Sequence, residues 1–506
     1  MKKTRIIIAM SATLLASSAF ATNGMNMEGY GPISTAMGGT AQAYNNGLGG
    51  MMNNPATMGM GSKAGNKFQI AVGGLNPTIS SEHKAGGLKT DSSGSFVMPG
   101  FGYATKSNGF TWGVGVMAQG GMGTDYGKAD LTGANKDLFA FGNSLTNTGN
   151  QNPANMKPLS GETIRSEVAV GRLIVPLVFE INDQFTIGGS IDYVWGGMDL
   201  QMDMDGATFG QLMQGNGGSV GGSMATTLGA AMQPGSSGGA GASIADVNWA
   251  RFDFSDDSNF TQATKGAGIA GKLGATFKIN NEWAVGASYH LKTAMSDFEG
   301  DAKLAMSVNI DSGNAAGGAP TGTYIDATMP VSGKIKVKNF QWPEMMAVGV
   351  TWTPNDKWKV SADVKQINWS AVMKEFSMSF TADSAPTNGN FANKILNVTM
   401  DQNWKDQTVM MIGGEFKPTK SLALRAGYNY ASNPVPDETL NPLFPATIQS
   451  HYTAGLGWMM TPGQLIDVAV TVAPEVSQMN TGNNITTTHS QLNWQLMYTY
   501  AWGIVK

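Results

Sequence analysis

The sequence predicts an all-β fold, a fourteen-stranded antiparallel transmembrane β-barrel with a small N-terminal plug. Three observations support this prediction. Apolar and polar residues alternate with a period of two along most of the chain, short turns alternate with long loops, and no segment contains the roughly 20 consecutive apolar residues of a spanning helix. A chain that crosses a membrane without such helices has to close its strands into a barrel, because lipid offers no partners for backbone polar groups.

The first 21 residues have the three parts of a secretory signal peptide. A cationic start, Lys2-Lys3, precedes an apolar stretch at 6–15, and the segment ends in Ala19-Phe20-Ala21. The apolar stretch is too short to anchor the chain in a membrane. We therefore expect residues 1–21 to be removed, so that the mature chain starts at Thr22.

Composition excludes several classes of function. The net charge of -4 becomes -7 when three positive charges leave with the signal peptide, which argues against a nucleic-acid partner. The chain contains no cysteine, so disulfides, thiol catalysis and Cys-ligated metals are excluded. The four histidines have neither metal-ligand nor triad spacing. We therefore expect no enzyme, no cofactor and no metal site.

Residues 22–64 differ from the rest of the chain, because they are rich in Gly, Ala, Asn and Met and lack the two-residue alternation. A disordered tail is the alternative, but the methionines from Met25 to Met60 are unusual for a solvated segment. We expect a plug over 22–64 and a barrel with long extracellular loops over 65–506.

Strand assignment depends on alternation and on the connections. In 283–292, for example, Trp283, Val285 and Tyr289 share one face, and polar or small residues share the other. Short turns such as Asn182-Asp183 indicate the periplasmic end, and long loops such as 201–262 indicate the extracellular end. A soluble β-sandwich would have shorter strands. The fourteen strands are predicted to begin near Lys67, Phe96, Phe110, Glu162, Gln184, Ala263, Trp283, Asn339, Trp358, Lys405, Leu422, Ser450, Gln464 and Gln491.

The third predicted strand ends in glycines. Alternation is regular from Phe110 to Ala118 and then stops at Gly120, Gly121 and Gly123. Missing side chains weaken strand pairing and permit a bend or bulge. The alternative is an ordinary glycine-rich strand end that enters a loop.

Several motifs resemble the FadL family of outer-membrane transporters. The segment Ala36-Met37-Gly38-Gly39-Thr40-Ala41-Gln42-Ala43, followed by Asn54-Pro55-Ala56, resembles the N-terminal hatch of that family. Further matches follow in the family's order at 180–188, Tyr289-His290-Leu291-Lys292, 300–303, Asn368-Trp369-Ser370, Trp404-Lys405-Asp406, Leu424-Arg425-Ala426-Gly427 and 433–439. Each motif is weak alone, but together they make a specific resemblance.

The resemblance implies passive, hatch-gated uptake of hydrophobic compounds, either long-chain fatty acids or aromatic hydrocarbons, through the outer membrane. Ligands would pass to an interior pocket and leave laterally beside a kinked third strand, at Gly120, Gly121 and Gly123. The expected partners are hydrophobic small molecules, outer-membrane lipid and lipopolysaccharide, with the chain acting as a monomer. A general hydrophilic porin and a structural or adhesive surface barrel are the alternatives, and neither needs a hatch.

Alternation turns several cations toward the lumen, including Arg172, Lys272, Lys405 and Arg425. A buried charge without a partner is costly, so each has to meet water, a carboxylate or a ligand. The resemblance implies that Lys405 and Arg425 contact a fatty acid carboxylate, and we include Arg172 with them as a ligand-binding candidate. Internal ion pairing is the alternative for all of these cations.

Overall fold

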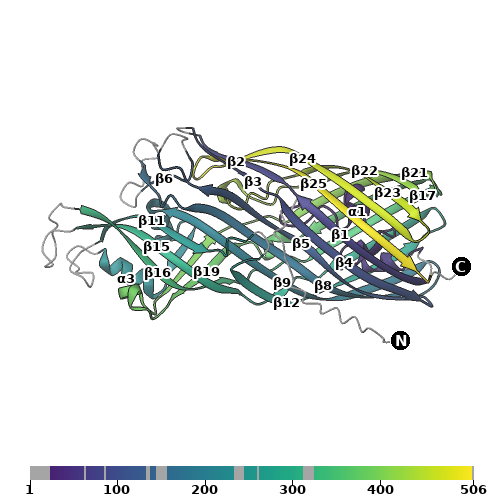
Figure 1. The fold of residues 1–506 in the computed structure, drawn as a ribbon, viewed down its shortest axis with the longest axis horizontal. Helices are drawn as coiled ribbons and strands as arrows, with labels where there is room; N and C mark the ends of the chain where they lie inside the picture. Colours follow the sequence, from purple (N-terminus) through teal and green to yellow (C-terminus); the bar gives the residue numbers. More distant parts are fainter. Residues whose placement is uncertain are drawn as a thin grey trace, which may run out of the picture.

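The computed structural model describes residues 23–61, 64–84, 87–132, 137–143, 156–232, 244–258, 261–311 and 324–503. The expected signal peptide, 1–21, lies outside the described residues. The chain forms a long β-barrel whose strands cross it obliquely, and the last described residues lie at one end (Figure 1). None of the helices in the described ranges is long and apolar enough to span a membrane.

The helices are short and few. Within the barrel lie α1 (Pro32–Ala36), η1 (Gly47–Met51) and η2 (Pro55–Met58). The others are α2 (Gly206–Met213), α3 (Ser223–Ala231), η5 (Trp369–Ala371), η6 (Pro386–Phe391) and η7 (Asp437–Thr439).

The strands up to the middle of the chain are β1 (Gly65–Leu75), β2 (Pro77–His83), β3 (Leu88–Ser93), β4 (Phe96–Ser107), β5 (Phe110–Lys128), β6 (Phe141–Gly142), β7 (Lys157–Pro158), β8 (Thr163–Glu180), β9 (Phe185–Asp205), β10 (Gly218–Gly221), β11 (Ile244–Phe254), β12 (Thr264–Lys278) and β13 (Trp283–His290). The remaining strands are β14 (Ala294–Met295), β15 (Phe298–Asp311), β16 (Tyr324–Lys338), β17 (Met345–Asn355), β18 (Trp358–Ile367), β19 (Glu375–Ala382), β20 (Ile395–Asp401), β21 (Gln407–Thr419), β22 (Leu422–Ala431), β23 (Ser450–Thr461), β24 (Gln464–Asn480) and β25 (Ile485–Trp502).

The main sheet closes on itself. Strand β1 pairs antiparallel with β4 on one side and with β25, near the end of the chain, on the other. The two-residue alternation decides which side chains face lipid. On β12, Ile269, Leu273 and Phe277 are exposed on the outside, whereas Lys272 and Thr276 are buried inside. This apolar exterior and polar interior are typical of an outer-membrane barrel.

Aromatic side chains gather at the end where the turns are short. The rings of Trp283 and Trp352 stack with their centroids 5.9 Å apart, and those of Trp358 and Phe416 stack at 4.4 Å. Tryptophan rings favour the boundary between membrane and water, because they are largely apolar but carry a polar N–H. The girdle marks the periplasmic end of the barrel.

The predicted class, an all-β antiparallel barrel, is right, but the predicted count of fourteen strands is wrong. The main sheet contains 23 strands. Several segments assigned to loops pair as strands and lengthen the wall at the extracellular end. Strand β11, inside the predicted loop 201–262, pairs with both β9 and β15, and β16 then pairs with β19. These strands satisfy backbone groups that a bare sheet edge would leave unpaired.

Candidate functional site

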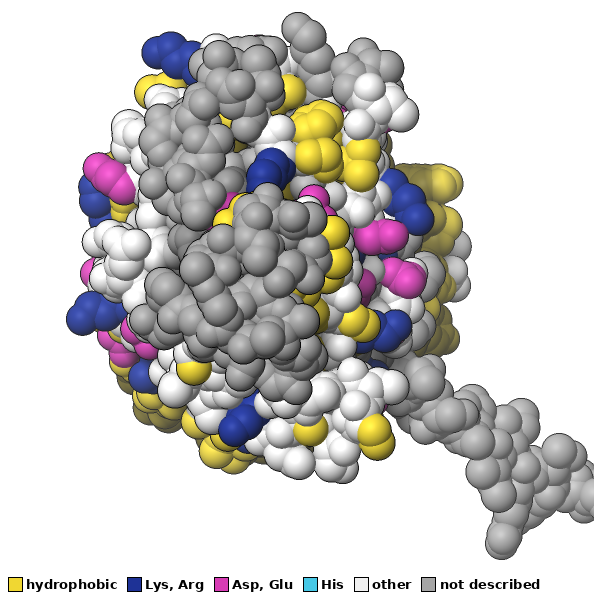
Figure 2. All heavy atoms as spheres, turned by 90° about the vertical axis from the view of Figure 1, so that its left-hand side faces the viewer, with side chains coloured by type: hydrophobic (Ala, Val, Ile, Leu, Met, Phe, Trp, Pro, Cys, Tyr) yellow, Lys and Arg dark blue, Asp and Glu magenta, His cyan; other side chains and the backbone are white. Residues whose placement is uncertain are grey.

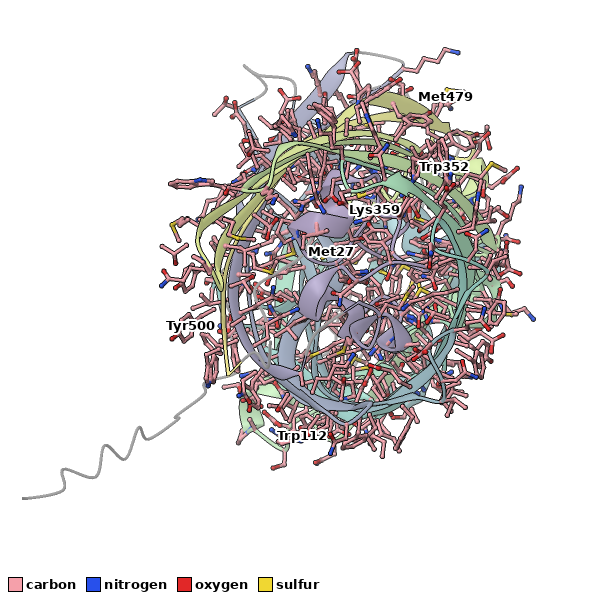
Figure 3. All side chains as sticks on the ribbon, turned by 90° about the vertical axis from the view of Figure 1, so that its right-hand side faces the viewer. Met27, Trp112, Trp352, Lys359, Met479 and Tyr500 are labelled. Atoms are coloured by element: carbon pink, nitrogen blue, oxygen red, sulfur yellow. The ribbon has the colours of Figure 1, made fainter. Side chains whose placement is uncertain are left out.

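The segment 23–61, which we call the hatch, fills the barrel lumen. A view along the barrel from the periplasmic end shows its short helices enclosed by the ring of strands (Figure 3). Almost all of its residues are buried, including Met37, Met51 and the polar Asn54. A straight aqueous passage through the barrel is therefore blocked at this level.

Glycines in the wall allow the hatch backbone to approach closely. A side chain at Gly286 on β13 would collide with the carbonyl oxygen of Gln42, and one at Gly413 on β21 would collide with that of Met37. The same holds for Gly427 on β22, which faces the backbone of residues 37 and 38. The 67 glycines of the sequence are therefore partly explained by this close packing of the hatch backbone against the wall.

Side chains of the wall hold the hatch through its peptide groups. The Asp363 carboxylate on β18 accepts hydrogen bonds from the amides of Ala41 and Gln42, at 2.6 and 3.0 Å. The Gly38 amide donates to Thr453 Oγ1 at 2.9 Å. One buried carboxyl group accepts from two successive peptide groups of the hatch, so Asp363 is a principal anchor.

The predicted hatch motif Asn54-Pro55-Ala56 begins η2. The Asn54 side chain accepts a hydrogen bond from the Ala56 amide at 3.1 Å, which caps the helix. Its Nδ2 donates to the carbonyl oxygen of Gln42 at 2.9 Å. Pro55 occupies the first helical position, where its fixed φ and missing N–H cost nothing. The motif therefore fastens one part of the hatch to another.

Strand β5, the third predicted strand, contains a bulge. Its pairing with β4 ends where Met117 meets Gly100. Its pairing with β8 shifts register between Ala118 and Gly120, so that Gln119 has no partner in the ladder. The first residues of β4, before Gly100, and the residues of β5 after Met117 are therefore not paired with each other in the wall.

The first residues of the hatch contact this bulge. Asn26 forms an antiparallel bridge with Gly120. The Tyr30 hydroxyl lies 2.7 Å from both the Gln119 carbonyl oxygen and Asn26 Oδ1. Burial raises the pKa of the Tyr30 phenol well above its ordinary value, so the hydroxyl keeps its proton and can donate.

The three glycines predicted at the lateral opening lie on this part of β5 and are buried. A side chain at Gly120 would collide with the Met25 carbonyl oxygen and crowd the Trp342 ring. One at Gly123 would collide with the Ser166 carbonyl oxygen on β8. At these two positions glycine provides room for neighbouring chain segments, in addition to the predicted bend or bulge in the strand.

An apolar cavity lies beside the bulge, where the ladder between β4 and β5 is interrupted. It has a volume of about 70 Å³. Its lining includes Met27, Tyr30 and Leu48 of the hatch, together with Met98 on β4 and Met117 on β5. The cavity therefore connects the hatch with the interrupted part of the wall.

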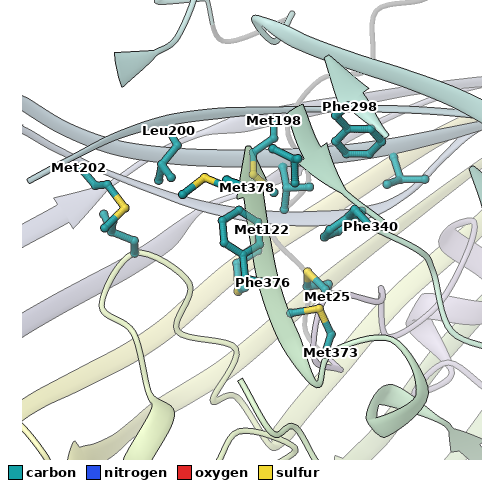
Figure 4. Close-up of a cluster of buried hydrophobic side chains, with 14 of the residues drawn as sticks. Met25, Met122, Met198, Leu200, Met202, Phe298, Phe340, Met373, Phe376 and Met378 are labelled. Carbon is teal, nitrogen blue, oxygen red and sulfur yellow. The ribbon is translucent and has the colours of Figure 1, made fainter. Parts of the chain in front are cut away.

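A second, small apolar cavity, of about 20 Å³, is lined mainly by methionine and phenylalanine side chains. Figure 4 shows this cluster, with Met25 of the hatch and Met122 of β5 facing side chains of β9 and β19. The cavity's lining residues are Met25, Met122, Val168, Met198, Leu200, Met202, Phe340, Met373, Phe376, Met400, Gln402, Asn441 and Phe444. Flexible thioethers adapt to apolar ligands of different shapes.

The predicted cations do not converge on either cavity. Arg172 Nη1 lies 2.7 Å from Asp192 Oδ2, and its Nε donates to the Gln119 side chain at the bulge. Lys272 also pairs with Asp192. Arg172 is thus engaged with a carboxylate while it holds the bulge residue.

The other two candidates lie elsewhere. Arg425 pairs with Glu415 at 2.8 Å and with Asp467 at 2.7 Å. Lys405 is exposed in the connection between β20 and β21, where the two-residue alternation used to turn it inward does not apply. Among the residues that the structure describes, no carboxylate oxygen lies within 4.0 Å of its ammonium group. The described residues also contain no group of three or more His, Cys, Asp or Glu that could hold a metal ion.

Comparisons with known proteins agree with this architecture. The family model described as "Outer membrane protein transport protein (OMPP1/FadL/TodX)" matches residues 135–501. The crystal structure of the P. putida toluene transporter TodX superposes with a TM-score of 0.73 and 26% identity, covering 94% of this chain and 99% of that one.

Two further relatives match over shorter segments. An 84-residue segment, 17% of this chain, is 44% identical to a protein of unassigned function encoded beside a phosphoenolpyruvate carboxykinase gene in Chlorobium limicola. A 123-residue segment, 24% of this chain, is 29% identical to alkane uptake protein A of Marinobacter nauticus. These segments span only 41% and 24% of the two relatives. The family model covers most of the chain, and the chain therefore belongs to the OMPP1/FadL/TodX family, a family of outer-membrane transport channels that are not enzymes.

Proposed function

We propose that this chain takes up hydrophobic compounds passively through the outer membrane. The observation that carries the proposal is the Met- and Phe-lined cavity that adjoins the first residues of the hatch, close to an interrupted wall. A hydrophilic porin would need an open polar lumen, whereas the hatch fills this one. The toluene transport of TodX and the alkane uptake of the Marinobacter relative, as their names state, agree with an apolar cargo.

The proposed route leads sideways. A ligand would enter the methionine-lined cavity, pass Met25 and Met122, and reach the cavity beside the bulge. From there it would enter the membrane between β4 and β5. An apolar molecule gains about 0.8 kcal/mol per methylene when it moves from water into lipid. Lateral release therefore avoids the aqueous periplasm.

Among the two substrate classes, we propose neutral hydrocarbons before fatty acids. Neither cavity has a charged side chain among its lining residues. A carboxylate buried there would be costly, because no cation lines either cavity. For a fatty acid, Lys405 remains the candidate head-group contact, since Arg172 and Arg425 are already paired with carboxylates.

The lateral exit is tested by a matched pair of alanine variants. Gly120→Ala places a methyl group against the Met25 carbonyl and displaces the hatch from the bulge. Gly414→Ala on β21 meets only the Lys359 carbonyl oxygen, at 3.8 Å, lines neither cavity, and is the control. Uptake of labelled toluene is measured in cells that lack other hydrocarbon channels. We expect Gly120→Ala to lower uptake several-fold and Gly414→Ala to retain it.

Two results would contradict these proposals. If folded Gly120→Ala protein transports at the wild-type rate, the exit lies elsewhere. If the wild-type protein admits a hydrophilic sugar as fast as toluene, the porin alternative is right. Comparing toluene with oleate in the same cells tests the order of the two substrate classes.

We also propose that the chain acts as a monomer surrounded by lipid, with lipopolysaccharide in the outer leaflet. The closed wall and its apolar exterior support this arrangement. Native mass spectrometry of protein released from detergent would show one chain per particle. A stable dimer or trimer would contradict it.

A further inference from the structure

A third cavity, of about 210 Å³, lies at the periplasmic end between the hatch and the wall. The hatch contributes Leu48 and Met58 to its lining, and the wall contributes Lys67 on β1, Lys106 on β4 and Thr111 on β5. We call this space the lysine cavity. Two cations line it, whereas no charged side chain lines either of the two apolar cavities.

Strand pairing fixes the positions of these polar side chains. Lys67 is the register partner of Ala104, and Thr111 is the register partner of Lys106, two residues further along β4. Paired strands lie about 4.8 Å apart, and residues two positions apart on one strand are about 6.6 Å apart. The long side chain of Lys67 can therefore reach a ligand that also contacts Thr111.

Two polar groups of the lysine cavity have no partner within the described part of the chain. No carboxylate oxygen lies within 4.0 Å of the Lys67 ammonium group, which also makes no hydrogen bond there. The Thr111 side chain is 3% exposed, and its buried hydroxyl oxygen has no hydrogen-bond partner. Lys106, by contrast, forms an ion pair with Glu180 and donates to the Gly59 carbonyl oxygen at 2.9 Å. A polar group buried without a partner is costly, so Lys67 and Thr111 both favour a ligand that can accept from them.

The periplasmic end of the barrel has an excess of positive charge. Asp467, the carboxylate that acts on Lys67, already lies 2.7 Å from the Arg425 guanidinium. Glu415 is shared by Arg425 and two lysines. The described charged residues at this end are eight cations, Lys67, Lys106, Lys278, Lys357, Lys359, Lys417, Lys420 and Arg425, and six carboxylates, Glu180, Asp183, Glu282, Asp356, Glu415 and Asp467. Two positive charges therefore remain unmatched.

The lysine cavity adjoins the cavity beside the bulge. Leu48 belongs to both linings. Gln69, the next inward residue after Lys67 on β1, lines the cavity beside the bulge, and that lining continues to Gly73. From Lys67 to Gly73 is six residues, or roughly 20 Å along the strand. The polar cavity and the apolar cavity thus follow one another in the order expected for a ligand with one charged end and a long apolar chain.

The lysine cavity is level with the aromatic girdle. Trp112 follows Thr111 on β5, and the Tyr103 ring lies 6.1 Å from the rings of both Trp112 and Trp502. Figure 3 shows Trp112 and Tyr500 on the outside of the ring of strands at this end. A charged group in the lysine cavity would therefore lie at the height of the membrane surface, and an attached chain would point towards the membrane interior.

We infer that the lysine cavity binds the carboxylate of a fatty acid whose acyl chain occupies the cavity beside the bulge. The inference rests on the proposed uptake of hydrophobic compounds and assigns an interior head-group site for the second substrate class, besides the exposed Lys405. A carboxylate has two acceptor oxygens, which match the ammonium donor of Lys67 and the hydroxyl donor of Thr111. The apolar tail then reaches the interrupted wall first, while the charge stays among polar groups.

The test compares the binding of labelled oleate and methyl oleate to the purified full chain in detergent. Methyl oleate has the same chain without the charge. Lys67→Gln removes the ammonium group, and we expect it to bind oleate about tenfold more weakly than wild type, because a hydrogen bond to a charged group is lost. Binding of methyl oleate should not change. The control is Lys334→Gln, a 73% exposed lysine on β16, since basic side chains also lie around the margin of the extracellular end (Figure 2). It should bind both ligands like wild type.

Thr111→Val removes the hydroxyl group and keeps the branched shape of the side chain. We expect this variant to bind oleate several-fold more weakly and methyl oleate like wild type. Unchanged oleate affinity in both variants would overturn the assignment. Equal losses of oleate and methyl oleate would also overturn it, because they would show that Lys67 and Thr111 act through packing and not through the carboxylate. Binding is measured without transport, so its failure leaves the toluene uptake proposal intact, and the Gly120→Ala uptake experiment tests the route separately.

Discussion

Single residues decide how the hatch is held. Asp363 is 3% exposed and accepts two hatch amides. Lys365, two positions away on β18, is the nearby cation. The buried Asp363 carboxyl group accepts hydrogen bonds from two successive backbone N–H groups, as a neighbouring strand would in a sheet. The backbone of the wall does not reach these groups. The wall can therefore bind Ala41 and Gln42, which belong to no helix or strand of the hatch.

Replacing this residue should loosen the hatch. Asp363→Ala leaves the amides of Ala41 and Gln42 without an acceptor, and each buried donor left unsatisfied costs about 1–3 kcal/mol. We expect more frequent current bursts in planar bilayers than with wild type. Asp363→Asn keeps one acceptor oxygen and should have a smaller effect. Asp183→Ala, in an exposed turn, is the control. Wild-type currents in folded Asp363→Ala protein would show that other contacts suffice.

At the scale of elements, the membrane-spanning strands could be predicted from the sequence, whereas the strands above the membrane could not. The membrane-spanning strands β12 and β13 were predicted correctly, because alternation over many residues is a local signal. Strands β15, β16, β19 and β20 also alternate, but whether such segments form loops or wall depends on partners far away in sequence. Strand β11, for example, pairs Asp253 with Lys303. Local patterns do not specify such pairings.

The hatch element as a whole should control leakage. Deleting residues 23–61 removes the segment that occupies the lumen, while the wall keeps its own ladder between β1 and β25. We expect an increase in single-channel conductance over wild type, measured in planar bilayers at fixed salt. Circular dichroism of the same sample checks that the barrel remains folded. If a folded deletion protein conducts like the wild type, the hatch does not seal the lumen.

At the scale of the whole molecule, the closed sheet should make the chain resistant to detergent. A barrel has no free edge, so unfolding has to break a continuous ladder. We expect unheated protein to migrate differently from boiled protein on detergent gels, with a predominantly β circular dichroism spectrum. A mainly helical spectrum, or identical migration before and after boiling, would contradict the closed barrel.

The candidate site was only partly predictable. Gly120 was identified because a run of glycines interrupts the alternation, which is a local signal. The methionine-lined cavity could not be assembled, since Met25, Met122, Met198 and Met373 come from four distant segments. For Arg172 and Arg425, alternation indicated the side of the wall but not the carboxylate on a neighbouring strand. Alternation along a strand specifies which side of the wall a side chain faces. Only the closed sheet specifies which side chains on neighbouring strands it contacts.

The contacts between wall glycines and the hatch backbone allow the selectivity of the channel to be engineered. At Gly286, Gly413 and Gly427 the wall contacts peptide groups of the hatch, and those groups are the same whatever side chains the hatch carries. The fit therefore depends on the path of the hatch backbone more than on its side chains. Residues such as Met25 and Met27, which line the cavities, can be replaced to change which compounds are carried. The contacts between the hatch backbone and the wall glycines would stay unchanged. The same barrel can thus serve as a reusable frame for channels of different selectivity.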